Sequence, residues 1–240
     1  MAPLLKVEGL EVFYGKAKVI NGISFEFDKG EFVSFIGANG AGKSTSLDSI
    51  SNLTNWHGKI AFDDIDLSSL SPSEIVRLGV IQSPERRNLF PFMTVKGNLL
   101  MGGYLFRSTV KENLEFVFDL FPVLKERERQ KARTLSGGEQ RMLTVGRSLM
   151  SKPRLLMLDE PTLGLAPKLV VDLSKAIGRL KEQGITILLM EQSVNLAFEH
   201  SNKIHILEIG EIVRSVSPQQ LEVKDSIVEA YFPRKGPLKY

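Results

Sequence analysis

The residues with the clearest chemical potential form a glycine-rich run, GANGAGKST, at positions 37–45. The run matches the pattern G-x-x-x-x-G-K-[ST] through Gly37, Gly42, Lys43 and Ser44. Glycines let backbone N–H groups curl around phosphate oxygens at dihedral angles that side chains disfavour. A helix starting directly after the loop points its positive N-terminal end at the same anion. The pattern therefore predicts a site for the phosphates of ATP, in preference to a chance glycine turn.

The parts of this loop have distinct expected roles. Lys43 should reach the β- and γ-phosphates of ATP, and the Ser44 hydroxyl should ligate Mg²⁺. ATP and Mg²⁺ are thus the predicted cofactors. We expect nucleotide contacts along the whole loop: Gly37, Ala38, Asn39, Gly40, Ala41, Gly42, Lys43, Ser44 and Thr45.

Two acidic residues, Asp159 and Glu160, follow the apolar run LLML at 155–158. Ligands of open α/β sheets bind at the carboxyl ends of the strands, so both acids are expected beside the phosphate loop. Asp159 is predicted to hold Mg²⁺ through water, and Glu160 to orient or deprotonate the attacking water. The alternative is a buried strand whose terminal acids simply meet solvent, and the phosphate loop upstream favours the catalytic interpretation.

The segment LSGGEQ at 135–140 begins a predicted helix that continues as RMLTVGRSLM. Ser136 and Glu139 have the spacing of a capping box, which any helix can use. Gly137 and Gly138, however, each cost about 1 kcal/mol of helix stability relative to alanine. We therefore expect another group to approach the backbone closely at this helix start.

With GANGAGKST before it and LLMLDEP after it, LSGGEQ resembles the ATP-binding subunits of ABC transporters over nearly the whole chain. The resemblance implies ATP hydrolysis that powers transport, in a head-to-tail dimer with a second ABC ATPase subunit. Each ATP would lie between the phosphate loop of one subunit and the LSGGEQ segment of the other. The residues facing the partner's ATP would be Ser136, Gly137, Gly138 and Glu139.

The resemblance also suggests roles for two residues outside these motifs. Tyr14 in VFYG resembles the aromatic side chain that stacks on adenine, and the resemblance favours this role over that of an ordinary strand aromatic. Gln82 in VIQSPE resembles the glutamine that contacts Mg²⁺ and the attacking water and joins them to a helical subdomain. Its alternative interpretation is a polar strand terminus.

At two positions the chain departs from the commoner family sequence. A G-L-D-P turn is replaced by GLAP, with Ala166, and Gln192 stands where most members have a switch histidine. Gln192 can donate an amide hydrogen bond to the γ-phosphate but cannot shuttle a proton. The expected catalytic residues are therefore Glu160, Gln192 and Gln82, and the expected Mg²⁺ ligands are Ser44, Gln82 and Asp159.

GLAP, the pair Glu191–Gln192 and residues 84–103 together resemble the ATPases of bacterial branched-chain amino acid importers. Those importers usually pair two non-identical ATPases on integral membrane permease subunits, and an extracytoplasmic substrate-binding protein takes part indirectly. Importers of urea or another small polar solute are the close alternative. The sequence leaves open which solute is transported and whether the ATPase dimer is homomeric or heteromeric.

Two other functions compete with transport. A nucleic-acid ATPase of the same superfamily usually has long coiled coils or paired cassettes, and the sequence shows neither heptads nor a second phosphate loop. A nucleotide-gated binding module with low turnover is suggested by Ala166 and Gln192. Steady-state ATP hydrolysis distinguishes this module from a transport motor.

The elements that must position these residues alternate along the chain. Apolar runs without alternation indicate strands covered on both faces, hence a mainly parallel sheet between helices. We predict an α/β P-loop NTPase fold with a mixed central sheet, an N-terminal antiparallel β subdomain and an inserted helical subdomain at about 91–133. Residues 1–90 and 134–240 would form the nucleotide-binding core of a single domain. Expected strands are 23–27, 31–37, 59–64, 154–159, 185–190 and 203–210, and expected helices are 46–53, 167–183 and 193–201.

Composition fits an ordinary globular protein of 240 residues, 42% hydrophobic and 25% charged. The chain has no cysteine, which excludes disulfides and thiolate metal sites, and its net charge of +3 is too small to argue for nucleic acid. No apolar run approaches the ~20 residues that cross a bilayer. We expect a peripheral protein held at the cytoplasmic face of the membrane by permease subunits. His57, His200 and His205 are expected to be structural, and the tail 232–240 a surface extension.

Overall fold

The computed structural model describes residues 2–218, so the tail 232–240 lies outside the described residues. Two sheets organise this part of the chain. The smaller one is antiparallel, with the order β2-β1-β4-β5. Its strands are β1 (Leu5–Tyr14), β2 (Ala17–Phe27), β4 (Trp56–Phe62) and β5 (Ile65–Asp66).

The larger sheet has six strands in the order β10-β9-β3-β8-β7-β6. Every neighbouring pair is parallel except β9 and β10, which are antiparallel. The predicted mixed, mainly parallel α/β fold with an N-terminal antiparallel sheet is confirmed. The strands are β3 (Phe32–Ile36), β6 (Val80–Ser83), β7 (Leu155–Asp159), β8 (Thr186–Glu191), β9 (Lys203–Glu208) and β10 (Glu211–Val216).

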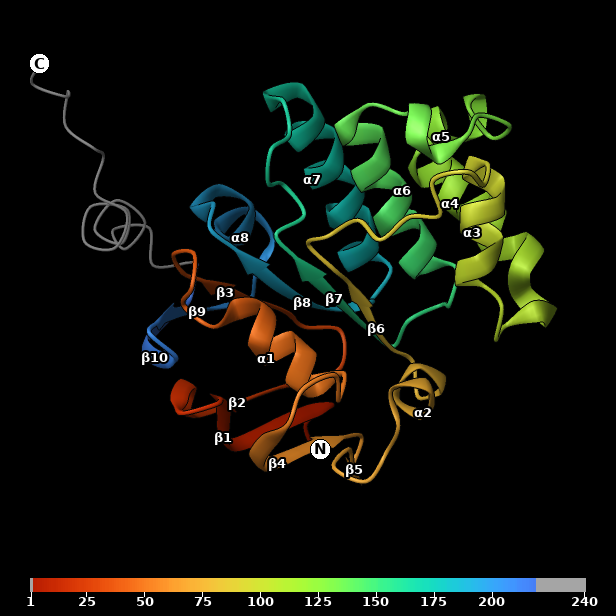
Figure 1. Cartoon of the computed structure of the whole chain (residues 1–240). Helices are drawn as coiled ribbons and strands as arrows, with labels where there is room; N and C mark the ends of the chain where they lie inside the picture. Colours follow the sequence, from red (N-terminus) through yellow and green to blue (C-terminus); the bar gives the residue numbers. More distant parts are fainter. Residues whose placement is uncertain (1, 219–240) are drawn as a thin grey trace, which may run out of the picture.

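Helices cover both faces of the larger sheet. Figure 1 shows α1 between the antiparallel sheet and the larger sheet, whereas α3 to α7 gather on the opposite side. The helices are α1 (Lys43–Ile50), α2 (Pro72–Arg77), α3 (Val95–Gly102), α4 (Val110–Leu120), α5 (Pro122–Glu126), α6 (Gly137–Leu149), α7 (Pro167–Glu182) and α8 (Val194–His200). Short 3₁₀ turns occur at Arg107–Thr109 and Ala132–Thr134.

Burial on both faces explains the unbroken apolar runs of the central strands. In β7, Leu155 and Met157 belong to the core shared with the antiparallel sheet, whereas Leu156 and Leu158 belong to the core beneath α6 and α7. The helices at 95–126 share that second core. Within residues 91–133 the only β pairing is an isolated bridge between Thr94 and Lys131.

Several strands and helices end earlier than the sequence pattern indicates, because the residues that follow them have a left-handed backbone conformation. Asp63 and Asp64 have φ of 51° and 63°, so β4 stops before them. Asn52, with φ of 53°, follows the end of α1, and Ile209, with φ of 44°, follows β9. Strand β1 was not predicted, because its register shifts around Gly9 and interrupts the alternation of apolar residues.

Candidate functional site

The phosphate loop connects β3 to α1 and packs tightly against the rest of the chain. A Cβ at Gly37 would lie 2.4 Å from the carbonyl oxygen of Leu207, and Gly42 has φ of 105° with Ile20 directly beside it. Both positions therefore require glycine. The backbone N–H of Gly37 donates to the carbonyl of Glu191 at 3.2 Å, which fixes the start of the loop to β8.

Lys43 is the buried cation of the site. Its Nζ donates to the carbonyl oxygens of Gly37 at 2.6 Å and Ala38 at 2.9 Å. It also forms an ion pair with Glu160 Oε1 at 3.0 Å. An ammonium group has three N–H donors, so all three are used within the chain.

Asp159 and Glu160 lie at the carboxyl end of β7, as predicted, and both are buried. Glu160 has φ of 44°, and its N–H donates to the carbonyl of Met190 at 2.8 Å. Asp159 Oδ1 and Glu160 Oε2 make no hydrogen bond to any described residue. Burial raises the pKa of Asp159 to about 6, against the opposing effect of a hydrogen bond from Ser44.

Ser44, Gln82 and Asp159 line one cavity of about 430 Å³, so the three predicted Mg²⁺ ligands come together. Gln82 Nε2 donates to Asp48 Oδ1 at 3.0 Å, and Ser51 donates to Gln82 Oε1 at 2.7 Å. A hydroxyl, an amide and a buried carboxylate with an unpaired oxygen suit Mg²⁺, which prefers oxygen ligands. Asp48 was not identified from the sequence, although it lies one helical turn after Ser44.

A second cavity, of about 320 Å³, adjoins the loop. Lys43, Ser44 and Thr45 line it, together with Glu160 and Val19. A larger cavity of about 640 Å³ opens at the other end of the sheet, before β7 and β8, and includes none of the predicted site residues.

Gln192 and Tyr14 both lie on the surface of the protein. Gln192 directly follows β8, and its backbone N–H donates to Glu191 Oε2 at 3.0 Å while the residue itself is exposed. Tyr14 ends β1 and is 52% exposed. Neither lines any of the three cavities that include phosphate-loop residues, so their contacts with γ-phosphate and adenine remain predictions.

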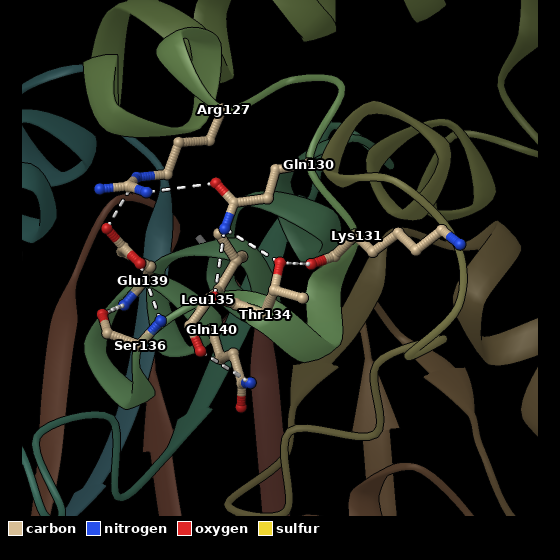
Figure 2. A network of polar contacts seen from close by, with 8 residues as sticks. All are labelled: Arg127, Gln130, Lys131, Thr134, Leu135, Ser136, Glu139 and Gln140. Carbon is tan, nitrogen blue, oxygen red and sulfur yellow. Dashed lines mark hydrogen bonds and ion pairs between the residues drawn. The ribbon is translucent and has the colours of Figure 1, made fainter.

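The LSGGEQ segment forms the expected capping box at the start of α6. Ser136 N–H donates to Glu139 Oε2 at 2.8 Å, the Ser136 hydroxyl accepts from Glu139 N–H at 3.4 Å, and Arg127 pairs with Glu139 at 2.8 Å (Figure 2). The close approach expected at these glycines is made by side chains of the same chain. A Cβ at Gly138 would lie 2.1 Å from Leu169 Cδ1.

Side chains of α6 also hold the backbone that follows Gln82. Arg141 donates to the carbonyl of Pro84 at 3.2 Å, and Arg147 donates to the carbonyl of Asn88 at 2.7 Å. Ser148 contacts the carbonyl of Gln82 itself at 3.5 Å. Helix α6 therefore connects the LSGGEQ segment directly to the segment that contains Gln82.

The histidines take part in packing rather than in a ligand cluster. His57 lies edge-on to Phe13, and His205 is buried with its Nδ1 2.7 Å from Ser215 Oγ. Burial lowers the pKa of His205 to about 4. Among residues 2–218, no group of three or more His, Cys, Asp or Glu side chains could hold a metal ion. None of the helices in the same range combines the length and apolar character needed to cross a bilayer.

Comparison with known proteins agrees with this arrangement. The sequence model of the ABC transporter family matches residues 20–163. The chain is 40% identical to the high-affinity branched-chain amino acid transport ATP-binding protein BraG of Pseudomonas aeruginosa, over 95% of this chain and 99% of BraG. It is 31% identical to BraF of the same organism, which has the same descriptive name, over 95% of this chain and 97% of BraF.

The ADP conformation of an ATP-binding cassette of an ABC transporter superposes with a TM-score of 0.84 at 25% identity, covering 98% of this chain and 100% of the cassette. The match to this family thus agrees with the fold, the phosphate loop, the acidic pair and the capped LSGGEQ helix. The protein belongs to the ABC transporter family and is an ATP-binding, ATP-hydrolysing subunit of that family.

Proposed function

We propose that this subunit hydrolyses MgATP to power a membrane importer of branched-chain amino acids. The observation that supports the solute most directly is the 40% identity to BraG across almost the full length of both chains. Two non-identical relatives of one organism, BraG and BraF, share the description, which favours a heteromeric pair of ATPases. The alternative functions are import of urea and nucleotide-gated binding with little ATP turnover.

The chemistry follows from the described side chains. Ser44, Gln82 and Asp159 would hold Mg²⁺, which supplies charge stabilisation for the phosphates. Lys43 binds phosphate oxygens, and Glu160, whose Oε2 is buried without a partner, orients or deprotonates the attacking water. Gln192 contributes an amide hydrogen bond to the γ-phosphate.

A second ATPase subunit, docked head to tail, completes the site in this proposal. Ser136 and Gly137 are exposed at the start of α6, a helix of 13 residues. Free backbone donors and the helix dipole at such an N-terminus favour a phosphate group. Glu139 is held by Arg127 and by the capping box, which keeps the first turn rigid.

Permease subunits would dock on the helical segment at about 91–133 and the adjoining surface. Several large apolar side chains are exposed there, and such side chains mark interaction surfaces when they cluster. A cavity of about 260 Å³ is lined by Gln82, Gly102 and Arg147, and this supports docking close to a predicted Mg²⁺ ligand. Such docking would hold the protein at the cytoplasmic face of the membrane. The exposed apolar residues are Phe90, Phe92, Leu100, Met101, Tyr104 and Leu105.

The test uses Glu160→Gln in the full chain, together with Glu182→Gln as a matched control at the exposed end of α7. Glu160→Gln should retain ATP binding and lose turnover, whereas Glu182→Gln should behave like the wild type. Cells lacking the gene should recover leucine uptake, but not urea uptake, when given the wild type. Undiminished hydrolysis by Glu160→Gln contradicts the assigned role, and recovery of urea uptake alone contradicts the solute.

A further inference from the structure

Glu191, the last residue of β8, has a buried carboxylate that no step of the proposed hydrolysis uses. Only 2% of the residue is exposed. Its Oε1 accepts from the backbone N–H of Thr162 at 3.0 Å and from the Thr162 hydroxyl at 2.5 Å. Its Oε2 accepts from the backbone N–H groups of Gln192 at 3.0 Å and Ser193 at 3.1 Å. Four donors from two separate segments therefore converge on one side chain.

The backbone around Glu191 adds two more connections. Its carbonyl accepts from the N–H of Gly37, the first residue of the phosphate loop, at 3.2 Å. The carbonyl of the preceding residue, Met190, accepts from the N–H of Glu160 at 2.8 Å. The end of β8 is thus bonded to the phosphate loop, to Glu160 and the turn after it, and to the segment that contains Gln192.

Only a carboxylate satisfies this set of donors. A glutamine at position 191 would offer one acceptor oxygen, and its NH₂ group would face either the Thr162 donors or the two N–H groups after β8. All four bonds are partly buried, so a donor left without an acceptor there costs part of its desolvation free energy. The turn after Glu160 and the segment 192–193 would then separate from each other.

We infer that Glu191 is a positioning residue that ties the phosphate loop, the turn after Glu160 and Gln192 into one unit. It touches no phosphate itself. It sets where Glu160 and Gln192 lie relative to an ATP held by Lys43, and it makes the turn at Thr162 and the segment 192–193 move together. The catalytic part of this inference rests on the proposed ATP hydrolysis, whereas the mechanical part does not.

Two measurements on the full chain test the inference. Glu191→Gln should lower kcat for ATP by about 10- to 100-fold, because bonds to a charged acceptor are lost. The Kd for ATP without Mg²⁺ should change less than about threefold, since Lys43 and its loop contacts are unaltered. Hydrogen exchange should become faster in both segments, 161–165 and 191–194. Thr162→Val, which removes only the hydroxyl, should give a smaller loss of kcat, and Thr162→Ser should restore the wild-type value.

The controls separate this inference from the proposed function and from simple unfolding. Glu182→Gln should leave kcat and exchange unchanged. If the wild type hydrolyses ATP and Glu191→Gln hydrolyses it equally fast, the inference is overturned and the proposed function stays intact. Equal losses of kcat and ATP affinity, or equal losses in Thr162→Val and Thr162→Ser, also overturn it. If the wild type shows coupled exchange but hydrolyses no ATP even when assembled with its partner ATPase and permease subunits, the mechanical unit is supported and the proposed function is refuted.

Discussion

Asp159 should make the protein less stable whenever its carboxyl is ionised. Burial raises its pKa from 3.8 to about 6, and one pKa unit corresponds to about 1.4 kcal/mol. Below pH ~4 the carboxyl is protonated in both folded and unfolded chains. As pH rises from about 4 to 6, the unfolded chain releases the proton first, so the free energy of unfolding falls. Above pH ~6 the loss is complete, at about 3 kcal/mol.

Asp159→Asn removes this charge at every pH and preserves the volume of the side chain. Without nucleotide, the variant should therefore be more stable than the wild type by about 3 kcal/mol at pH 7.5, but by only about 1 kcal/mol at pH 4.5. For a domain of this size the larger difference corresponds to a rise in Tm of about 6–12 °C. Urea denaturation at the two pH values measures both quantities.

Asp172→Asn is the matched control, because Asp172 is an exposed carboxyl on α7. It should change stability little at either pH. Addition of Mg²⁺ and ATP should stabilise the wild type more than Asp159→Asn, since the variant lacks the anionic ligand. An advantage of Asp159→Asn that is equal at both pH values, or a variant less stable than the wild type at pH 7.5, would refute the reasoning.

Three further changes probe other parts of the fold. Ser136→Ala removes the cap of α6 and should lower the free energy of unfolding by about 1 kcal/mol in urea; an unchanged value would mean that the cap contributes nothing. Gly138→Ala places a Cβ 2.1 Å from Leu169 Cδ1 and should lower the free energy of unfolding by about 1–3 kcal/mol. Adding Leu169→Ala should partly relieve this loss. Strictly additive effects of the two changes would contradict the proposed clash. The pKa of His205 is lowered to about 4, so the unfolded chain takes up a proton first as pH falls from 6.5. The free energy of unfolding should therefore fall by about 3 kcal/mol between pH 6.5 and about 4. In His205→Gln its pH profile should be flatter, and an unaltered profile would exclude this histidine as the cause.

Local chemistry explains why the sequence alone identifies the segments that form the candidate site. The phosphate loop and the capping box each lie within nine consecutive residues, so their geometry follows from glycine conformations and helix capping. The acidic pair needs only the rule that parallel strands end at one edge of the sheet. These residues are therefore recognisable before any tertiary contact is known.

Contacts between distant segments are what the sequence pattern does not contain. The approach of Leu169 to Gly138 and the pairing of Lys43 with Glu160 join residues from separate elements. Neither has a periodic signature. Strand β1 was missed for a different reason, since the register shift near Gly9 removes the alternation on which strand prediction depends.

The three donors of Lys43 have a consequence for how affinity should be understood. An incoming phosphate oxygen that bonds to this ammonium group replaces the carbonyl of Gly37, the carbonyl of Ala38 or the carboxylate of Glu160. Binding at this lysine is an exchange reaction, so its free energy is the difference between two sets of charge-assisted bonds. When Glu160 is the partner displaced, the arrival of the phosphate and the release of the acid toward water are one event.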